Sequence, residues 1–311
     1  MRDSRTTRRV VAPLVCGLGL VACAVVWHVD IGPRWTQRLP EGWSWQSEFV
    51  GIQTWADPET GELPVRDTVA LYDRSISITS DVDRPRAIRV EDRHVSRDPA
   101  TGNMVWTSVA AAELDPRTGA HRGPGREHDQ FVFPRDVEPR SYTLRNGYLK
   151  GIHVVFERED EIDGLSTYVF HYRGPAEYTE SYERSDDLEG VHVEPGEEIR
   201  CADDQYVHRV WVEPLTGEMI KVEESCHAGD YIYERASGRR VAPVDRFASV
   251  TSGNAVLRRV ETTRRERTRY LWARRIVPGG LAGLGVALMG VAYAAGRAGR
   301  AAVDGEHDHA A

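Results

Sequence analysis

The chain has 311 residues, a formal net charge of -8 and 28% charged side chains. Proteins that bind nucleic-acid backbones normally carry an excess of positive charge, so this balance argues against a nucleic acid as partner. One large domain is the default expectation, because all-β units often exceed about 200 residues.

The first predicted element is an uncharged stretch over residues 10–27, which follows an arginine-rich start. At about 1.5 Å of rise per residue, this stretch is long enough to cross the hydrocarbon core of a bilayer. Trp27 lies at its end, where amphipathic rings are typical of the membrane surface. The sequence therefore predicts a cytoplasmic N-terminus over residues 1–9 and a transmembrane helix over residues 10–27.

Two other interpretations of this stretch stay open. A cleaved signal peptide would end in a small-residue site followed by polar chain, whereas the stretch stays apolar to Trp27. Residues 20–23 read Leu-Val-Ala-Cys, which matches a lipobox. In that case Cys23 would carry a lipid and become the mature N-terminus. Against this, residues 24–27 continue the apolar pattern where a lipoprotein normally turns polar.

Residues 28–253 are predicted to form one mainly β domain, and a repeated turn motif is its most specific feature. The copies read DPETGE, DPATGN, DPRTGA and EPLTGE, with first residues and glycines at Asp57 and Gly61, Asp98 and Gly102, Asp115 and Gly119, and Glu213 and Gly217. Each copy supplies a side-chain acceptor, a proline with preset φ and a glycine that tolerates positive φ. This is the chemistry of a type I turn followed by a glycine bulge, so four β-hairpins are expected.

Other segments also have the pattern of β-strands, so the predicted fold class is a hairpin-rich, mainly β domain of about ten strands. Residues 206–212 and 219–222 flank the fourth turn with the β-branched and aromatic side chains that strands favour. Residues 151–157 and 165–172 are joined through Asp163-Gly164, a strong signal for a short hairpin.

After the β domain, the pattern predicts a basic helical stalk over residues 254–275 and a second transmembrane helix over residues 276–296. The stalk arginines would contact acidic lipid head groups or simply remain solvated. Gly279, Gly283 and Ala287 share one face of the second helix, which favours close packing against the first helix or against another copy of the chain.

The charges flanking the two helices disagree about orientation. Arginines before the first helix place the N-terminus in the cytoplasm, whereas the basic stalk lies before the second helix and only Arg297 and Arg300 follow it closely. We give the first helix priority, because it usually decides orientation and a long domain translocates largely regardless of its charge. The protein is therefore expected in the cytoplasmic membrane, with an extracytoplasmic central domain and a cytoplasmic tail over residues 297–311.

Cys201 and Cys226 flank the fourth turn and are predicted to form a disulfide. If Pro214 pairs with Gly217, the hairpin register misses direct opposition of the two cysteines by about four residues, which a bulge over residues 202–204 would have to absorb. Such a bond persists in an oxidising compartment, which agrees with an external domain. Two unpaired, partly buried thiols are the alternative.

The sequence contains no nucleophile elbow, HExxH, phosphate loop or CxxC pair, so we nominate no catalytic, cofactor-binding or metal-binding residue. Possible metal ligands are His121, His128 and Asp129 beside a Gly-Pro-Gly turn, and His307 and His309 in the tail. An ordinary polar loop and tail explain both groups better. No cofactor is expected.

Two longer segments carry a resemblance to a known family. They are DQFVFPRDVEPRSYTL at residues 129–144 and RVWVEPLTGEMIKVEE at residues 209–224. With the DPxTG turns and the two terminal helices, they make the chain similar to the porin PorA-like family, actinobacterial envelope proteins of largely uncharacterised function. The resemblance implies a domain on the outer face of the cytoplasmic membrane and identifies no reaction.

These observations predict a membrane-anchored, non-enzymatic envelope component that binds an envelope lipid or solute, takes part in transport, or supports other envelope proteins. The alternative is an extracytoplasmic hydrolase acting on envelope polymers. The expected partners are the lipid bilayer, an envelope lipid or other envelope proteins, and a second copy through helix packing.

Overall fold

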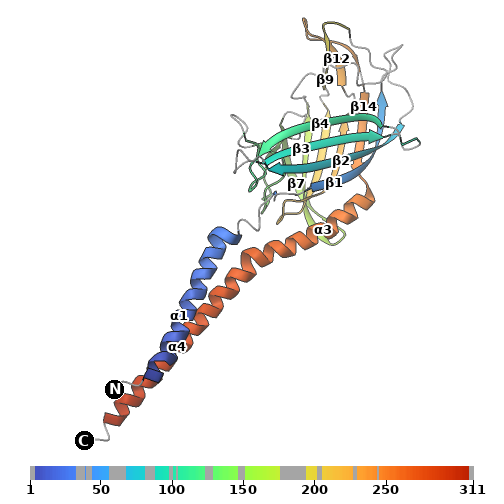
Figure 1. Ribbon diagram of the computed structural model, residues 1–311. Helices are drawn as coiled ribbons and strands as arrows, with labels where there is room; N and C mark the ends of the chain where they lie inside the picture. The colour runs from blue at the N-terminus through green and yellow to red at the C-terminus, as the bar shows by residue number, and fades with distance from the viewer. Residues whose placement is uncertain are drawn as a thin grey trace. The chain divides into compact units, whose positions relative to one another are not determined.

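The computed structural model divides into two compact units (Figure 1). One unit joins Met1–Gln37 to Arg267–Ala311, and the other is Arg38–Glu266. The structure describes residues 4–32, 39, 44–55, 68–80, 88–97, 101–102, 104–122, 129–145, 151–175, 194–201, 205–226, 230–243 and 245–307. A large sheet and two long apolar helices near the termini confirm the predicted mainly β class with flanking helices.

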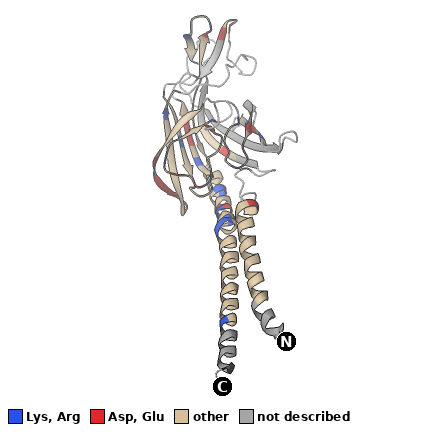
Figure 2. Cartoon of the chain, turned by 90° about the vertical axis from the view of Figure 1, so that its left-hand side faces the viewer, with Lys and Arg blue, Asp and Glu red and all other residues tan. Residues whose placement is uncertain are grey.

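The first unit is an antiparallel pair of helices. Helix α1 (Ser4–Val26) continues into a π-helical turn, η1 (Trp27–Ile31). On the other side, the π-helical turn η2 (Trp272–Ile276) leads into α4 (Val277–His307). Both helices are long and apolar enough to cross a membrane, and in Figure 2 long stretches of each are coloured as neither acidic nor basic.

Two glycines allow α1 and α4 to approach closely. A Cβ added to Gly17 would lie 2.7 Å from the carbonyl oxygen of Gly285, and a Cβ added to Gly285 would lie 2.7 Å from that of Gly17. Any larger residue at either position would force the backbones apart. Gly279 and Gly283 do not form the expected contact with α1, because a Cβ at either position meets nothing within 4 Å. Packing of a second copy of the chain against them stays a prediction. Each residue turns a helix by about 100°, so Gly283 points away from the side on which Gly285 meets α1.

The second unit contains an 11-stranded sheet in the order β4-β3-β2-β1-β14-β11-β10-β8-β7-β6-β5. All neighbouring strands are antiparallel except β5 and β6. The strands are β1 (Ser44–Trp55), β2 (Thr68–Ser80), β3 (Ile88–Arg97), β4 (Met104–Leu114), β5 (Asp129–Gln130), β6 (Tyr142–Leu144), β7 (Ile152–Ile162), β8 (Leu165–Gly174), β10 (Tyr206–Val212), β11 (Met219–Cys226) and β14 (Asp245–Thr251). A smaller sheet joins β13 (Arg239–Pro243), β12 (Asp230–Glu234) and β9 (Glu197–Cys201).

The large sheet curves so strongly that its β1–β4 half crosses in front of the remaining strands (Figure 1). Its two end strands are linked through isolated bridges, Leu114 to His121 and Ala120 to Gln130. Because of this curvature, side chains from both halves enter one hydrophobic core, including Phe49 of β1, Val90 of β3 and Phe170 of β8. Alternate residues of each strand point to this inner face, as the period of a β-strand requires.

Helix α3 (Gly253–Leu271) begins against the outer face of the same sheet. Ser252 caps its start by accepting a hydrogen bond from the Ala255 amide at 3.2 Å. A bulge between β10 and β11 leaves Ile220 out of the pairing register, and Ile220 packs with Leu165 and Val260 of α3. The irregular residue of the hairpin therefore contributes, with Leu165, to the apolar contact of the helix.

Candidate functional site

The EPLTGE turn between β10 and β11 is tightly hydrogen bonded. The Glu213 carboxylate is buried and accepts hydrogen bonds from the amide and the hydroxyl of Thr216, both at 2.7 Å. The Gly217 amide donates to the Glu213 carbonyl at 2.9 Å, and Gly217 has φ +74°. The side-chain acceptor and the glycine thus occupy the positions that the turn chemistry requires.

The other copies of the motif differ in what they connect. Gly102 has φ +73° and lies between the antiparallel strands β3 and β4. At Asp115, the carboxylate accepts hydrogen bonds from the amides of Arg117 and Thr118. The described residues after this turn form a bridge, His121 to Leu114. The glycine of the turn, Gly119, has φ +74°. Asp57, Gly61 and Asp98 lie outside the described residues.

The EPLTGE turn packs directly against residues 131–137, which we call the core segment. The Val137 amide donates to the Pro214 carbonyl at 2.6 Å, and the Asp136 amide donates to the Leu215 carbonyl at 3.0 Å. A Cβ on Gly217 would lie 2.1 Å from the carbonyl oxygen of Pro134, so the turn has no room for a side chain there. The two segments that carry the family resemblance are therefore in contact.

The core segment fills the inner face of the curved sheet. Phe131, Val132, Phe133 and Val137 are at most 5% exposed. The Phe133 ring lies 4.8 Å from that of Phe170 and 5.3 Å from that of Tyr142. The residues of the core segment pair with no strand in the described part of the sheet. Its role becomes visible only through the contacts it makes.

The possible metal ligands near the core segment have other partners. The Asp129 carboxylate forms a largely buried ion pair with Arg145 at 2.6 Å. The Arg145 carbonyl in turn lies 2.9 Å from Nε2 of His121. His128 and His309 lie outside the described residues, and the described part of the chain contains no group of three potential metal ligands. Asp129 therefore anchors one end of the core segment by binding an arginine.

A polar row crosses the inner face beside the apolar core. The strand registers align Tyr172, His208, Glu224, Ser249 and Gly51 across neighbouring strands. His208 is 2% exposed, and its Nδ1 lies 3.1 Å from a carboxylate oxygen of Glu224. The imidazole stacks on the Tyr206 ring at 6.3 Å. Sequence reasoning missed this pair, because only the β10–β11 register shows that the two residues are neighbours.

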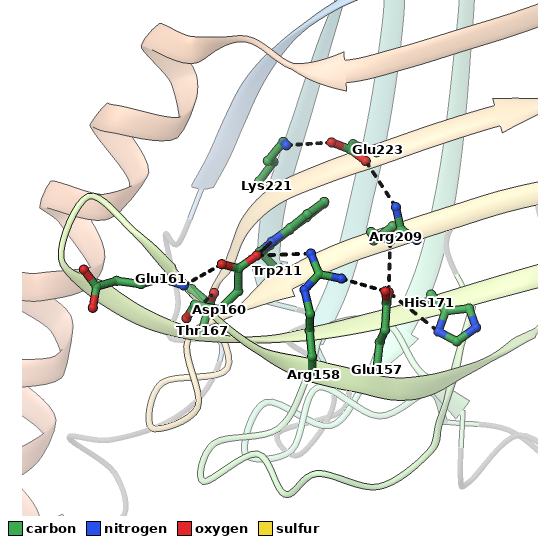
Figure 3. A network of polar contacts seen from close by, with 10 residues as sticks. All are labelled: Glu157, Arg158, Asp160, Glu161, Thr167, His171, Arg209, Trp211, Lys221 and Glu223. Carbon is green, nitrogen blue, oxygen red and sulfur yellow. Dashed lines mark hydrogen bonds and ion pairs between the residues drawn. The ribbon is translucent and has the colours of Figure 1, made fainter.

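A second polar network lies on the outer face of β7, β8, β10 and β11 (Figure 3). The Glu157 carboxylate contacts Arg158 at 2.6 Å and Arg209 at 3.0 Å. Glu223 contacts Lys221 at 2.6 Å, and the Lys221 ammonium lies 4.3 Å from the centroid of the Trp211 ring. The acidic and basic groups of this network neutralise one another, as in a solvated sheet face that covers a buried tryptophan.

Asp160 is the member of this network whose pKa is clearly shifted. Its carboxylate accepts a hydrogen bond from Nε1 of Trp211 at 2.9 Å, which lowers the pKa of Asp160 below its ordinary value of 3.8. The Glu161 amide, at 2.8 Å, and the nearby Arg158 act in the same direction, whereas burial opposes them. The charged form is therefore favoured in the folded state.

Asp160→Asn is expected to lower the free energy of unfolding near neutral pH by about 0.5 kcal/mol, a small value because the side chain is 36% exposed. A group with a depressed pKa stabilises the fold above its unfolded pKa and loses that contribution as the pH falls through its folded pKa. The difference between the two proteins should thus disappear on acidification below the ordinary carboxyl range. Denaturation of the full-length protein in detergent at several pH values checks this, and a difference independent of pH would contradict it.

The structure does not support the predicted disulfide. No disulfide is present among the side chains that it describes, and the Cys201 side chain lies outside them; the Cys226 thiol is buried. The backbones of the two cysteines belong to different sheets, since Cys201 pairs with Asp230 and Cys226 with Phe247. Strand β9 precedes the fourth hairpin in the chain and joins the smaller sheet, so it does not extend β10 in the register that would bring Cys201 towards Cys226. Cys23 lies within α1 and is exposed.

Comparison with known proteins assigns the family. The family model described as Porin PorA matches residues 50–294. The chain belongs to the porin PorA family. This confirms the resemblance, and the matched range includes both the core segment and the EPLTGE turn of this PorA family member.

Other comparisons add little to the PorA assignment. No curated protein matches the chain. Among solved structures, it is similar to a Bacteroides fragilis protein with a YmcC-like fold, with 12% identity, a TM-score of 0.27, and coverage of 70% of this chain and 97% of that chain. A TM-score this low supports no inference about fold or function.

Proposed function

We propose that this PorA family protein is a membrane-anchored component of the cell envelope, with α1 and α4 crossing the cytoplasmic membrane and the β domain outside the cytoplasm. The observation that carries the proposal is the close contact of two long apolar helices through Gly17 and Gly285. Small residues at such a crossing are typical of helices that pack in a bilayer, where close backbone approach stabilises the pair.

The side chains on the outward faces of the helix pair fit an apolar environment. Leu18 and Val25 of α1 are 55% and 56% exposed, and Val286 and Val291 of α4 are 61% and 60% exposed. A surface helix of a water-soluble protein would place charged or polar residues on this side. Contact with lipid acyl chains removes the cost of exposing these side chains to water.

The buried His208–Glu224 pair of the described β domain does not hold an activated nucleophile. Within the described domain, the imidazole of His208 faces the Glu224 carboxylate but makes no hydrogen bond to a serine, threonine or cysteine. A nucleophile activated by histidine would lie within hydrogen-bond distance of the ring. No specific observation favours the alternative of a hydrolase acting on envelope polymers.

The proposed topology is tested by adding protease to intact spheroplasts that contain the full-length protein. We expect digestion of the central domain and protection of the α1 region, because a sealed membrane shields only the cytoplasmic side and the spans. The control is the same treatment after membrane lysis, which should expose the C-terminal tail as well. Complete protection of the central domain in intact spheroplasts would place it in the cytoplasm and reject the orientation.

A further inference from the structure

The two π-helical turns of the helix pair lie side by side. Nε1 of Trp27, in η1, donates a hydrogen bond to the carbonyl oxygen of Ala273, in η2, at 2.7 Å. π-Helical turns are rare and occur frequently at functional sites. Trp27 and Trp272 therefore mark one level of the helix pair, where amphipathic rings are expected at the surface of a membrane.

Four arginines lie within a few residues of η2 along the same helical stretch, and we call them the arginine collar. They are Arg267, Arg269, Arg274 and Arg275, and all four are exposed. Arg274 donates a hydrogen bond to the Tyr270 hydroxyl, and its guanidinium carbon lies 5.6 Å from the centroid of the Tyr270 ring. Figure 2 colours basic residues blue near the upper end of the helix that leads to the C-terminus.

The collar carries more positive than negative charge. Among the residues that the structure describes, η1 carries Asp30, and Glu266 precedes Arg267 in the chain. Two carboxylates leave a positive excess where the apolar part of α4 begins. Trp272, 54% exposed between Arg269 and Arg274, adds a ring suited to the depth of the head groups.

Arginine is well suited to lipid phosphate. Its planar guanidinium presents several N–H donors that match two phosphate oxygens at once and is more weakly hydrated than an ammonium group. Under the proposed orientation, the collar lies on the external side, where basic residues next to a membrane span are disfavoured. Pairing with anionic head groups offsets that bias, since each basic residue near an anionic surface adds attraction.

We propose that the arginine collar binds the phosphate groups of anionic phospholipids in the leaflet that adjoins the β domain. This inference rests on the proposed insertion of α1 and α4 into a membrane. The guanidinium groups bind the phosphates, while the Trp27 and Trp272 rings lie at the level of the glycerol backbone.

The test uses the full-length protein in phosphatidylcholine vesicles with spin-labelled phosphatidylglycerol or spin-labelled phosphatidylcholine. Electron spin resonance measures how much of each labelled lipid is immobilised at the protein surface. The wild type should prefer phosphatidylglycerol by roughly fivefold, a modest value for basic residues that share a screened surface. Replacing all four collar arginines by glutamine should reduce the preference to about onefold, since no guanidinium remains to bind phosphate.

A matched control removes the same charge elsewhere. Replacing Arg89, Arg93, Arg97 and Arg122, which are exposed on the β domain, by glutamine should leave the preference unchanged. Equal loss in both variants would show a general charge effect and overturn the proposal, as would a wild type without preference. Alkaline carbonate extraction of the same vesicles separates the two proposals: release of the protein would reject membrane insertion itself, whereas retention without lipid preference would reject only the collar.

Discussion

Gly217→Ala is expected to lower the free energy of unfolding by about 3 kcal/mol or more. Alanine at φ +74° costs about 1 kcal/mol because its Cβ crowds the backbone. The larger part comes from the Cβ itself, which would lie 2.1 Å from the Pro134 carbonyl oxygen and 2.7 Å from that of Phe133. The turn would have to move off the core segment. Denaturant titration of the full-length protein in detergent, followed by tryptophan fluorescence, measures the loss.

Gly102→Ala is the matched control for this prediction. Gly102 has nearly the same φ, +73°, but an added Cβ meets nothing within 4 Å. Only the backbone cost remains, so the expected loss is about 1 kcal/mol. Similar losses in both variants would show that contact between the EPLTGE turn and the core segment contributes little to stability.

Gly17→Leu is expected to separate the two helices of the first unit. The new side chain would collide with the Gly285 carbonyl oxygen and with Met289, which an added Cβ alone already approaches to 2.7 and 2.8 Å. We expect a loss of about 2 kcal/mol or more, as for other overpacked sites. Thermal unfolding in detergent, followed by far-ultraviolet circular dichroism, should show a lower midpoint for the helical signal.

Two further variants test the assignment of this contact. Gly19→Leu makes the same change on the same helix where an added Cβ meets nothing within 4 Å, so it should leave the midpoint nearly unchanged. Gly285→Leu should resemble Gly17→Leu, and the double variant should lose less than the sum of the two, because both disrupt one crossing. Full additivity, or an equal effect of Gly19→Leu, would reject the crossing.

Local rules explain what the sequence could predict. The two terminal helices were predicted from continuous uncharged stretches, and the mainly β class from turn and strand patterns within a few residues. The proline and glycine of the EPLTG motif similarly define a turn without help from the rest of the chain. The family was recognisable for the same reason, since its segments are continuous in sequence.

Contacts between segments that are distant in the chain were decided by tertiary packing and could not be predicted from the sequence. The face on which α4 meets α1 depends on the helix crossing, which selected Gly285 rather than the Gly279 and Gly283 stripe. The partner of Cys201 depends on which strand β9 joins, and β9 entered the smaller sheet. Neither choice follows from side-chain type, because each is set by the arrangement of whole elements.

The sequence by itself therefore determined the composition of the protein: two apolar helices, a hairpin-rich β domain and the turns that join its strands. Only the tertiary structure brought the core segment onto the EPLTGE turn and His208 opposite Glu224. The physical reason is the separation along the chain of the residues that interact. A turn or a helix is stabilised by residues that are neighbours in the chain. The core of a curved sheet, in contrast, is stabilised by side chains that strand register and curvature bring together from distant segments.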